Sequence, residues 1–225
     1  MALKKNIKSI LEKTIPGLFY RIRLHRQFSR FSKFKDSYLV KTGYLKSFKK
    51  GYPVDLELNP LPWMNYPFLE FIKGRLNKNQ NLFEYGSGYS TVFFAERIQS
   101  VTSVEYDSEW YEKAKELIND FSNTEIIFQE LNENYPKTIN KTDRKYELVI
   151  IDGRNRVKCA LNSFEHLTSD GVLILDDSSR EEYKEIWDFY LGKGFREITF
   201  QGLKPNGFSI DHTTVFYRDG NCLGI

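Results

Sequence analysis

The sequence predicts an α/β fold: a seven-stranded, mostly parallel sheet that ends in an antiparallel hairpin, preceded by an N-terminal helical extension. Two observations predict it. Between residues 81 and 191, short apolar runs alternate with amphipathic segments of helical length, as in parallel strands that are buried on both faces. After Leu191 the helical segments stop, and two strand-like runs flank the turn-rich segment 202–207, which indicates the hairpin.

Residues 1–50 form a basic, amphipathic helical extension. They hold 14 Lys or Arg against two acids, a net charge of +12, whereas residues 51–225 hold 19 bases against 28 acids, a net charge of −9. Pro16-Gly17 separates two helical pieces. Ile7, Ile10, Leu11, Ile15 and Leu18 recur at helical spacing, and Phe28, Phe31 and Phe34 recur every three residues.

Two interpretations of this extension stay open. It either packs on the domain with its charges in water, or lies on an anionic membrane surface, as basic amphipathic helices do. Membrane contact would bring the protein close to lipid-linked glycan intermediates. A nucleic-acid partner is not expected, because it requires stacking aromatics interleaved with the basic residues on one exposed face. These phenylalanines are more typical of a core.

Residues 51–80 connect the extension to the sheet. The segment from Gly51 to Tyr66 is rich in proline and aromatic residues, and proline stiffens a chain without permitting regular helix. A helix is then expected from Phe68 to Leu76.

Residues 81–225 form the α/β domain. Strands are expected at Asn81–Tyr85, Val101–Glu105, Glu125–Gln129, Glu147–Ile151, Val172–Leu175, Arg196–Gln201 and Thr213–Arg218. Helices are expected at Ser90–Ile98, Ser108–Asp120, Val157–His166 and Arg180–Leu191.

The turn after the first strand is the most informative local motif. Gly86 and Gly88 allow the backbone to approach a ligand where a Cβ atom would clash, and Ser90 is placed to cap the next helix. The dinucleotide fingerprint has a third glycine, but this chain has Thr91 there, which argues against NAD or FAD. Glu84, just before the turn, suits a cationic amino group such as that of S-adenosylmethionine.

The second strand ends in Glu105, which is placed to accept hydrogen bonds from ribose hydroxyls, and Tyr106 beside it can lie against an adenine ring. Asp152 and Asp176-Asp177 also follow strands. Ligand sites in such sheets lie at the carboxyl ends of strands, so these acids are expected to share one site.

Four motifs carry a resemblance to a known family. Glu84-x-Gly86-x-Gly88, then Glu105, then Tyr146–Gly153, then Gly171–Asp177 resemble the successive motifs of class I S-adenosylmethionine-dependent methyltransferases, over about residues 80–217. The resemblance implies a Rossmann-like sheet and S-adenosylmethionine as cofactor. The string Ile151–Ala160 with the downstream Asp-Asp resembles a bacterial subgroup related to enzymes that act on sugar hydroxyls.

The resemblance implies O-methylation of a carbohydrate or glycan intermediate. A small-molecule or protein methyltransferase of the same fold, or a non-catalytic module that keeps the fold, remains as an alternative. In this family an N-terminal segment often covers the cofactor, so Trp63 and Tyr66 either form a lid that contacts the substrate or plug the end of the sheet.

The strand-end acids are the candidate catalytic residues. Asp152 is expected to act as a general base or a metal ligand, and Asp177 with Asp176 resembles the acids that hold Mg²⁺ in metal-dependent O-methyltransferases. The alternative is that one of the pair caps the helix beginning near Arg180. Arg154 and Arg156 either bind an acidic acceptor or pair with nearby acids.

The sequence contains no apolar run of 18 residues and no apolar stretch near the N-terminus typical of a secretory signal. Cys159 and Cys222 lack metal-ligand spacing, which favours reduced thiols. A cytoplasmic protein, peripheral to the membrane if the extension binds lipid, is therefore expected.

Overall fold

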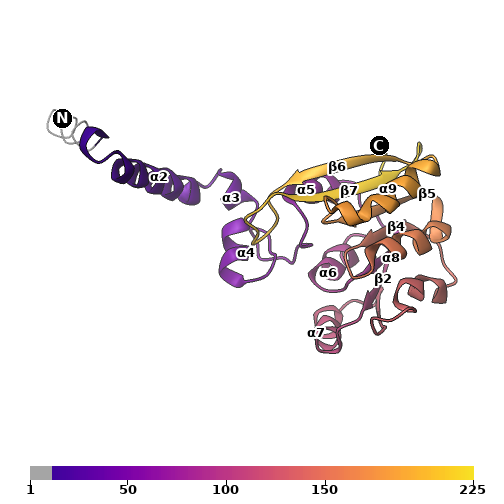
Figure 1. The fold of residues 1–225 in the computed structure, drawn as a ribbon. Coiled ribbons are helices and arrows are strands. Elements are labelled where there is room, and N and C mark those ends of the chain that lie inside the picture. The colour runs from indigo at the N-terminus through magenta and orange to yellow at the C-terminus, as the bar shows by residue number, and fades with distance from the viewer. Residues whose placement is uncertain (1–11) are drawn as a thin grey trace.

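The computed structural model describes residues 12–225, in which a projecting helix is followed by an α/β domain (Figure 1). The domain contains one seven-stranded sheet in the order β3-β2-β1-β4-β5-β7-β6, and only β7 runs antiparallel to its neighbours. The strands are β1 (Asn81–Tyr85), β2 (Ser100–Glu105), β3 (Thr124–Phe128), β4 (Tyr146–Ile151), β5 (Leu167–Asp176), β6 (Arg196–Gly202) and β7 (Asp211–Tyr217). The predicted mostly parallel sheet with a C-terminal hairpin is confirmed.

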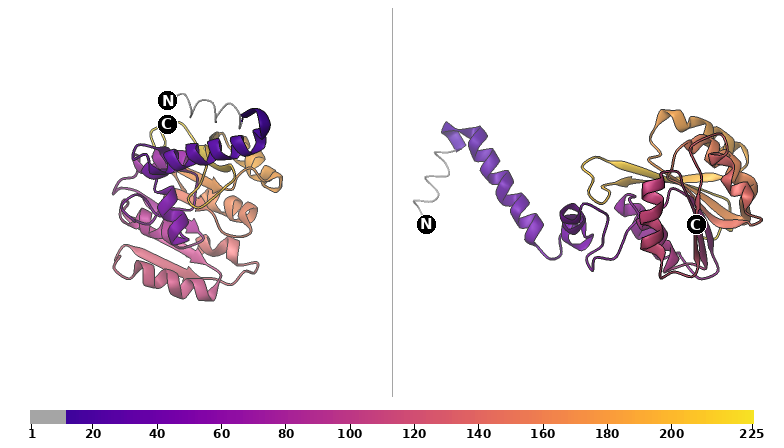
Figure 2. Two further views of the ribbon diagram at one scale, coloured as in Figure 1. Left: turned by 90° about the vertical axis from the view of Figure 1, so that its left-hand side faces the viewer. Right: turned by 90° about the horizontal axis from the view of Figure 1, so that it is seen from below.

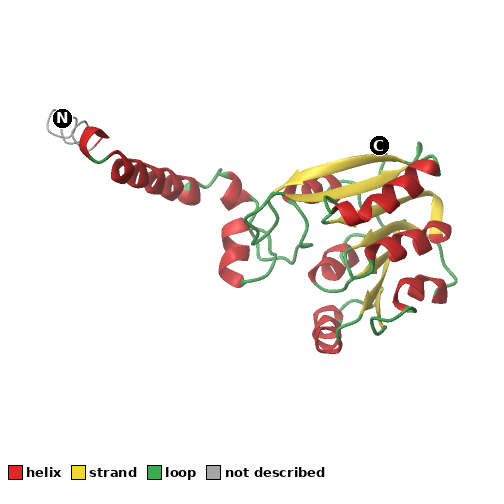
Figure 3. Ribbon diagram, in the orientation of Figure 1, coloured by secondary structure: helices red, strands yellow, loops and turns green. Residues whose placement is uncertain are grey.

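Helices cover both faces of this sheet (Figure 3). Leu82 of β1 points to the face covered by α5 (Tyr66–Lys73) and α6 (Tyr89–Ala95), and its neighbour Phe83 points to the opposite face, covered by α8 (Arg156–Ser163) and α9 (Lys184–Gly192). The remaining elements of the domain are α7 (Ser108–Ile118), which packs on β2 and β3, and the short 3₁₀ turns η1 (Tyr135–Lys141), η2 (Phe164–His166) and η3 (Glu181–Tyr183).

Two predicted helices are shorter than expected because 3₁₀ turns replace their ends. The helix predicted at Val157–His166 divides into α8 and η2, and the one predicted at Arg180–Leu191 begins as η3 before α9. β5 also starts five residues before the predicted Val172, at Leu167. Two helices have side-chain N-caps: Asp107 accepts a hydrogen bond from the Trp110 N–H, and Asn65 accepts one from the Phe68 N–H.

The N-terminal region divides into a projecting part and a packed part. Helix α2 (Pro16–Lys33), which we call the arm, starts at the predicted Pro16-Gly17 interruption and has no buried residue. It extends away from the domain in Figure 1 and in the right-hand view of Figure 2. The short helices α3 (Tyr38–Lys41) and α4 (Tyr44–Lys50) instead bury Leu39 and Tyr44 against the domain.

The arm therefore differs from the packed extension considered above. Phe28 and Phe31 are exposed to solvent and are not part of the core. Ile7, Ile10 and Leu11 lie outside the described residues. Among residues 12–225, no helix combines the length and apolar character needed to cross a membrane.

Candidate functional site

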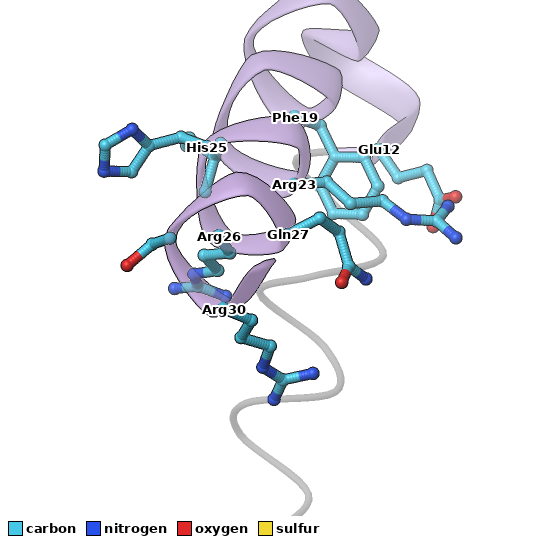
Figure 4. Close-up of a pocket in the computed structure, with 9 residues that line it drawn as sticks. Glu12, Phe19, Arg23, His25, Arg26, Gln27 and Arg30 are labelled. Carbon is cyan, nitrogen blue, oxygen red and sulfur yellow. The ribbon is translucent and has the colours of Figure 1, made fainter. Parts of the chain in front are cut away.

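A cavity of about 460 Å³ lies at the carboxyl ends of β1, β2, β4 and β5. This volume falls in the range of small-molecule sites. Its lining residues come from the segments that follow these strands: Gly86, Ser87, Ser90, Glu105, Tyr106, Asp107, Trp110, Asp152, Gly153, Arg154, Arg156, Asp177 and Arg180. A larger hollow, about 880 Å³, runs along the arm and contains none of the strand-end acids (Figure 4). The strand-end cavity is thus the candidate site.

The glycine turn forms one wall of this cavity. Gly86 has φ +100° and Gly88 φ +150°, conformations that side chains rarely adopt. A Cβ atom at Gly88 would lie 3.1 Å from the Trp110 ring, whose Nε1 donates a hydrogen bond of 2.7 Å to the Ser87 carbonyl. Trp110 therefore supports the turn from behind, and the turn tolerates no side chain at Gly88 without strain.

Glu105 fixes the turn to the end of β2. Its Oε2 accepts hydrogen bonds from the Ser87 N–H and hydroxyl, and its Oε1 accepts from the backbone N–H groups of Tyr106 and Asp107. The carboxylate lines the cavity although the residue is only 4% exposed. The carboxylate therefore lies beside the glycine turn, and its role toward ribose hydroxyls stays a prediction.

Glu84 lies deeper than the sequence predicts. Its carboxylate accepts hydrogen bonds from three hydroxyls, those of Ser90, Thr91 and Ser103, and it does not line the cavity. Burial raises the pKa of Glu84 to about 7, and these hydroxyls oppose the rise. Ser90, which lines the cavity, connects Glu84 with any ligand there.

Tyr106 and Arg154 form the outer rim. The Arg154 Nε donates a hydrogen bond of 3.2 Å to the Tyr106 hydroxyl, and its guanidinium carbon lies 5.8 Å from the centre of that ring. Arg154 is exposed, so its guanidinium is accessible to an incoming acceptor.

Arg156 is paired with the strand-end acids. Its guanidinium donates to the Gly153, Asp152 and Asp176 carbonyl oxygens and forms an ion pair of 3.0 Å with Asp152 Oδ1. Because these bonds occupy its donors and only 9% of the side chain is exposed, Arg156 orients the acids and is poorly placed to bind an acidic acceptor.

Asp152 presents the other half of its carboxylate to the cavity. Its side chain is 30% exposed, and among the described residues no donor bonds to its Oδ2. Burial raises the pKa of Asp152 to about 6, against the lowering effect of Arg156. A carboxylate with this pKa is ionised near neutral pH and suits a general base.

The acids that lie close enough to hold a metal ion differ from the predicted set. Asp176, Asp177 and Asp211 have ligand oxygens within 4.8 Å of one another, and Asp152 is not in this group. Lys204 Nζ lies 3.2 Å from Asp177 Oδ1 and 3.3 Å from Asp211 Oδ1, where a cation would bind. As arranged, these residues do not fit Mg²⁺, because an ammonium group already pairs with two of the three acids.

Asp177 does not cap a helix, contrary to one interpretation of the sequence. It has φ +50° and pairs with Arg180, Arg156 and Lys204. Burial would raise the pKa of Asp177, but Lys204 and Arg156 lower it below the ordinary value. Asp176 is 2% exposed and accepts a hydrogen bond from the Thr213 hydroxyl, and burial raises its pKa well above normal.

Trp63 and Tyr66 do not line the cavity. Tyr66 is buried against Tyr38, and its backbone N–H donates to Leu203 in the loop between β6 and β7. The connector docks on this hairpin and not over the glycine turn. The connector residue that does approach the turn is Tyr52, whose ring stacks on Tyr89 with centroids 4.9 Å apart.

Sequence reasoning missed Ser87, Trp110 and Asp211. Trp110 had a signal in its spacing, since it lies three residues after the helix cap Asp107 and one turn into a helix that faces the glycine loop. Asp211 gave no such signal in the sequence, because only the fold of the hairpin brings it, with Lys204, close to Asp177.

Comparison with solved structures finds many with the same fold. An rRNA methylase from Streptococcus thermophilus aligns with a TM-score of 0.54 at 14% identity, over 68% of this chain and 97% of that chain. A putative O-methyltransferase from Klebsiella pneumoniae aligns with a TM-score of 0.54 at 13% identity, over 86% and 96%. A putative methyltransferase from Streptococcus mutans in complex with SAH aligns with a TM-score of 0.51 at 15% identity, over 66% and 94%.

No protein-family model matches the chain, and no curated protein matches it. At these identities the structural likeness defines the fold. It agrees with the strand order, the antiparallel hairpin and the cavity at the strand ends. The chain has the Rossmann-like fold of the class I S-adenosylmethionine-dependent methyltransferases.

Proposed function

We propose that this protein is an S-adenosylmethionine-dependent methyltransferase that binds its cofactor in the strand-end cavity. The observation that carries the proposal is the pairing of Gly86 and Gly88 with Glu105: a turn open to a ligand, and a carboxylate that faces it from the next strand. The four family-like motifs and the shared fold support the same conclusion.

S-adenosylmethionine supplies an electrophilic methyl group when it is bound. Glu105 would accept hydrogen bonds from the ribose hydroxyls, and Tyr106, which also lines the cavity, would hold the adenine. Ser90, whose hydroxyl donates to Glu84, would offer its oxygen to the methionine end. Holding the methyl donor and the acceptor together can lower the free-energy barrier of such a transfer by up to about 7–11 kcal/mol.

Asp152 is the general base in this proposal. Its free Oδ2 removes the proton from the attacking hydroxyl, while Arg156 holds Oδ1 and keeps the carboxylate oriented. Asp177 contributes to the acceptor side, where its charge is balanced by Lys204 and Arg180. This route uses no metal ion, because Asp152 removes the proton and Lys204 pairs with two of the acids that resemble a Mg²⁺ site.

The proposed acceptor is a hydroxyl of a carbohydrate or glycan intermediate. The string Ile151–Ala160 supports it through its resemblance to the sugar-related subgroup, and the polar rim formed by Arg154, Asp177 and Arg180 suits a hydroxyl-rich molecule. A nucleic-acid acceptor, as named for one structural neighbour, is less favoured, because residues 51–225 carry a net charge of −9 and would repel phosphates.

Calorimetry with S-adenosylhomocysteine tests the cofactor, with Gly88→Ala as the variant that should lose binding. Transfer of labelled methyl from S-adenosylmethionine to nucleotide sugars, lipid-linked sugars and RNA then tests the acceptor. Binding without transfer to any sugar would refute the carbohydrate assignment. Absence of cofactor binding by the intact protein would refute the proposal that it is a methyltransferase and would favour a non-catalytic module.

A further inference from the structure

Within the described residues, 12–225, the arm packs on no element of the sheet domain. It comprises 18 residues, about 27 Å of helix, and none of them is buried. Large apolar side chains on it are open to solvent: Tyr20 is 64% exposed, Leu24 54% and Phe28 56%. A surface of this kind is costly in water, and exposed apolar patches mark sites of interaction.

The largest exposed apolar side chains of the arm form one stripe and a row of basic residues forms another, with Phe19 and Ile22 lying beside the basic row. Tyr20, Leu24, Phe28 and Phe31 follow one another at intervals of four, four and three residues, which places them in one stripe. The basic residues Arg23, Arg26, Arg30 and Lys33 follow at intervals of three, four and three. From the 3.6-residue repeat, the two stripes lie roughly 135° apart. Figure 4 shows Arg26 and Arg30 extending from successive turns of the helix.

A second exposed surface lies at the same end of the domain as the arm (Figure 1). Phe48 of α4 packs edge-on against Phe208 of the loop between β6 and β7, with centroids 5.7 Å apart. Phe208 is nevertheless 79% exposed, and Ile210 beside it 69%. Lys49 and Lys50 are exposed on α4. Basic and apolar groups thus occur together on two separate elements at this end.

These features fit a lipid bilayer better than a nucleic acid or a second protein copy. A nucleic acid stacks its bases on aromatic rings, whereas Leu18, Ile22 and Leu24, which are exposed on the arm, are aliphatic and offer no ring to a base. A bilayer offers two layers that match them, acyl chains for the apolar stripe and phosphates for the arginines. The charge of +12 on residues 1–50 against −9 on the rest would draw this end to an anionic surface and turn the domain away from it.

We propose that the arm lies in the interface of an anionic membrane, with Tyr20, Leu24, Phe28 and Phe31 toward the acyl chains and the arginines at the lipid phosphates. Phe208 and Ile210 form a second contact at the base of the arm. This proposal is independent of the methyl transfer, because it rests on residues outside the strand-end cavity.

Vesicle flotation tests the proposal with the full-length protein. Vesicles of phosphatidylcholine alone are compared with vesicles of an equal mixture of phosphatidylcholine and phosphatidylglycerol. Two double variants address the two stripes, Leu24→Ser with Phe28→Ser and Arg26→Glu with Arg30→Glu. The matched controls change exposed residues of the domain in the same way, Leu131→Ser with Leu191→Ser and Lys113→Glu with Lys137→Glu.

We expect the wild type and both controls to float with anionic vesicles only, and each arm variant to partition at least about tenfold less. The arm variants should keep the thermal midpoint of the wild type, because the arm makes no buried contact. The proposal would be overturned if the wild type and Arg26→Glu/Arg30→Glu floated equally with anionic vesicles. It would also be overturned if the wild type bound neutral and anionic vesicles equally. Retention on RNA without flotation, or a dimer that the arm variants abolish while no form binds vesicles, would overturn it as well.

Discussion

The carboxylate of Glu105 holds Ser87 by two hydrogen bonds, at 3.2 Å from its backbone nitrogen and 3.0 Å from its hydroxyl. One side chain therefore both shapes the glycine turn and faces the ligand cavity. A change at Glu105 is expected to affect the ligand more than a change at any neighbouring exposed acid.

We expect Glu105→Ala to weaken S-adenosylhomocysteine binding by roughly 1.5–3 kcal/mol, because a charged acceptor of ligand hydroxyls is lost. Isothermal titration calorimetry measures the change. Glu109→Ala, an exposed acid in the first turn of α7, is the control and should bind as the wild type does. Unchanged affinity in Glu105→Ala would show that the ribose is held elsewhere.

Asp152→Asn should remove most methyl transfer while changing the affinity for S-adenosylhomocysteine by less than about threefold, the pattern of a group that acts in the chemical step. Since the pKa of Asp152 is about 6, wild-type turnover should fall as the pH drops through 6, where the base becomes protonated. Rates across pH for the wild type and for Asp188→Asn, an exposed control, check both expectations. A flat profile would exclude Asp152 as the base.

Lys204→Met should create a site for a divalent cation. Removing the ammonium leaves Asp177 and Asp211 without their shared partner, beside Asp176, and hard oxygen ligands then attract Mg²⁺ or Mn²⁺. Electron paramagnetic resonance of free Mn²⁺ should show at least about tenfold tighter binding than in the wild type or in the exposed control Lys184→Met. If the wild type bound Mn²⁺ as tightly as the variant, Lys204 would not be the cation that fills this position.

Glu84→Gln should change the pH dependence of stability. The native pKa of about 7 lies above the ordinary 4.5, so between these values the native state binds more protons than the unfolded state. Stability of the wild type relative to the variant should therefore decline as the pH rises from about 4.5 to 7, by roughly 3 kcal/mol.

Urea unfolding at several pH values measures this difference. Glu125→Gln, an exposed change on β3, is the control and should run parallel to the wild type. Parallel curves for Glu84→Gln as well would mean that Glu84 titrates normally and that its three hydroxyl donors fully offset its burial.

The sheet was predictable because strand burial leaves a direct trace in the sequence. Uninterrupted apolar runs such as Leu148–Ile151 occur only where both faces are covered, and the acids that follow them mark the strand ends. Glu105 and Asp152 could be assigned to one cavity for the same reason: parallel strands that share an edge bring their carboxyl ends together.

The pairings within the site were not predictable to the same degree. Asp152 and Arg156 are four residues apart, and whether the guanidinium folds back on the acids or faces the cavity depends on the start of α8. Lys204 pairs with Asp177, which lies 27 residues earlier in the sequence, because the hairpin brings the two side chains together. The arm shows a further limit, since a helix with an apolar stripe has the same periodicity whether a protein or a membrane covers that stripe.

The isolation of the arm also has a consequence for its helix–coil equilibrium. Eighteen residues that include Gly17, Ser29 and several aromatic side chains form only a marginal helix in water when no tertiary contact supports them. A surface that binds the helical form shifts this equilibrium toward helix, so adsorption and folding of the arm become one event. Far-ultraviolet circular dichroism should then show helix content rising on addition of anionic vesicles, in the wild type and not in Arg26→Glu/Arg30→Glu.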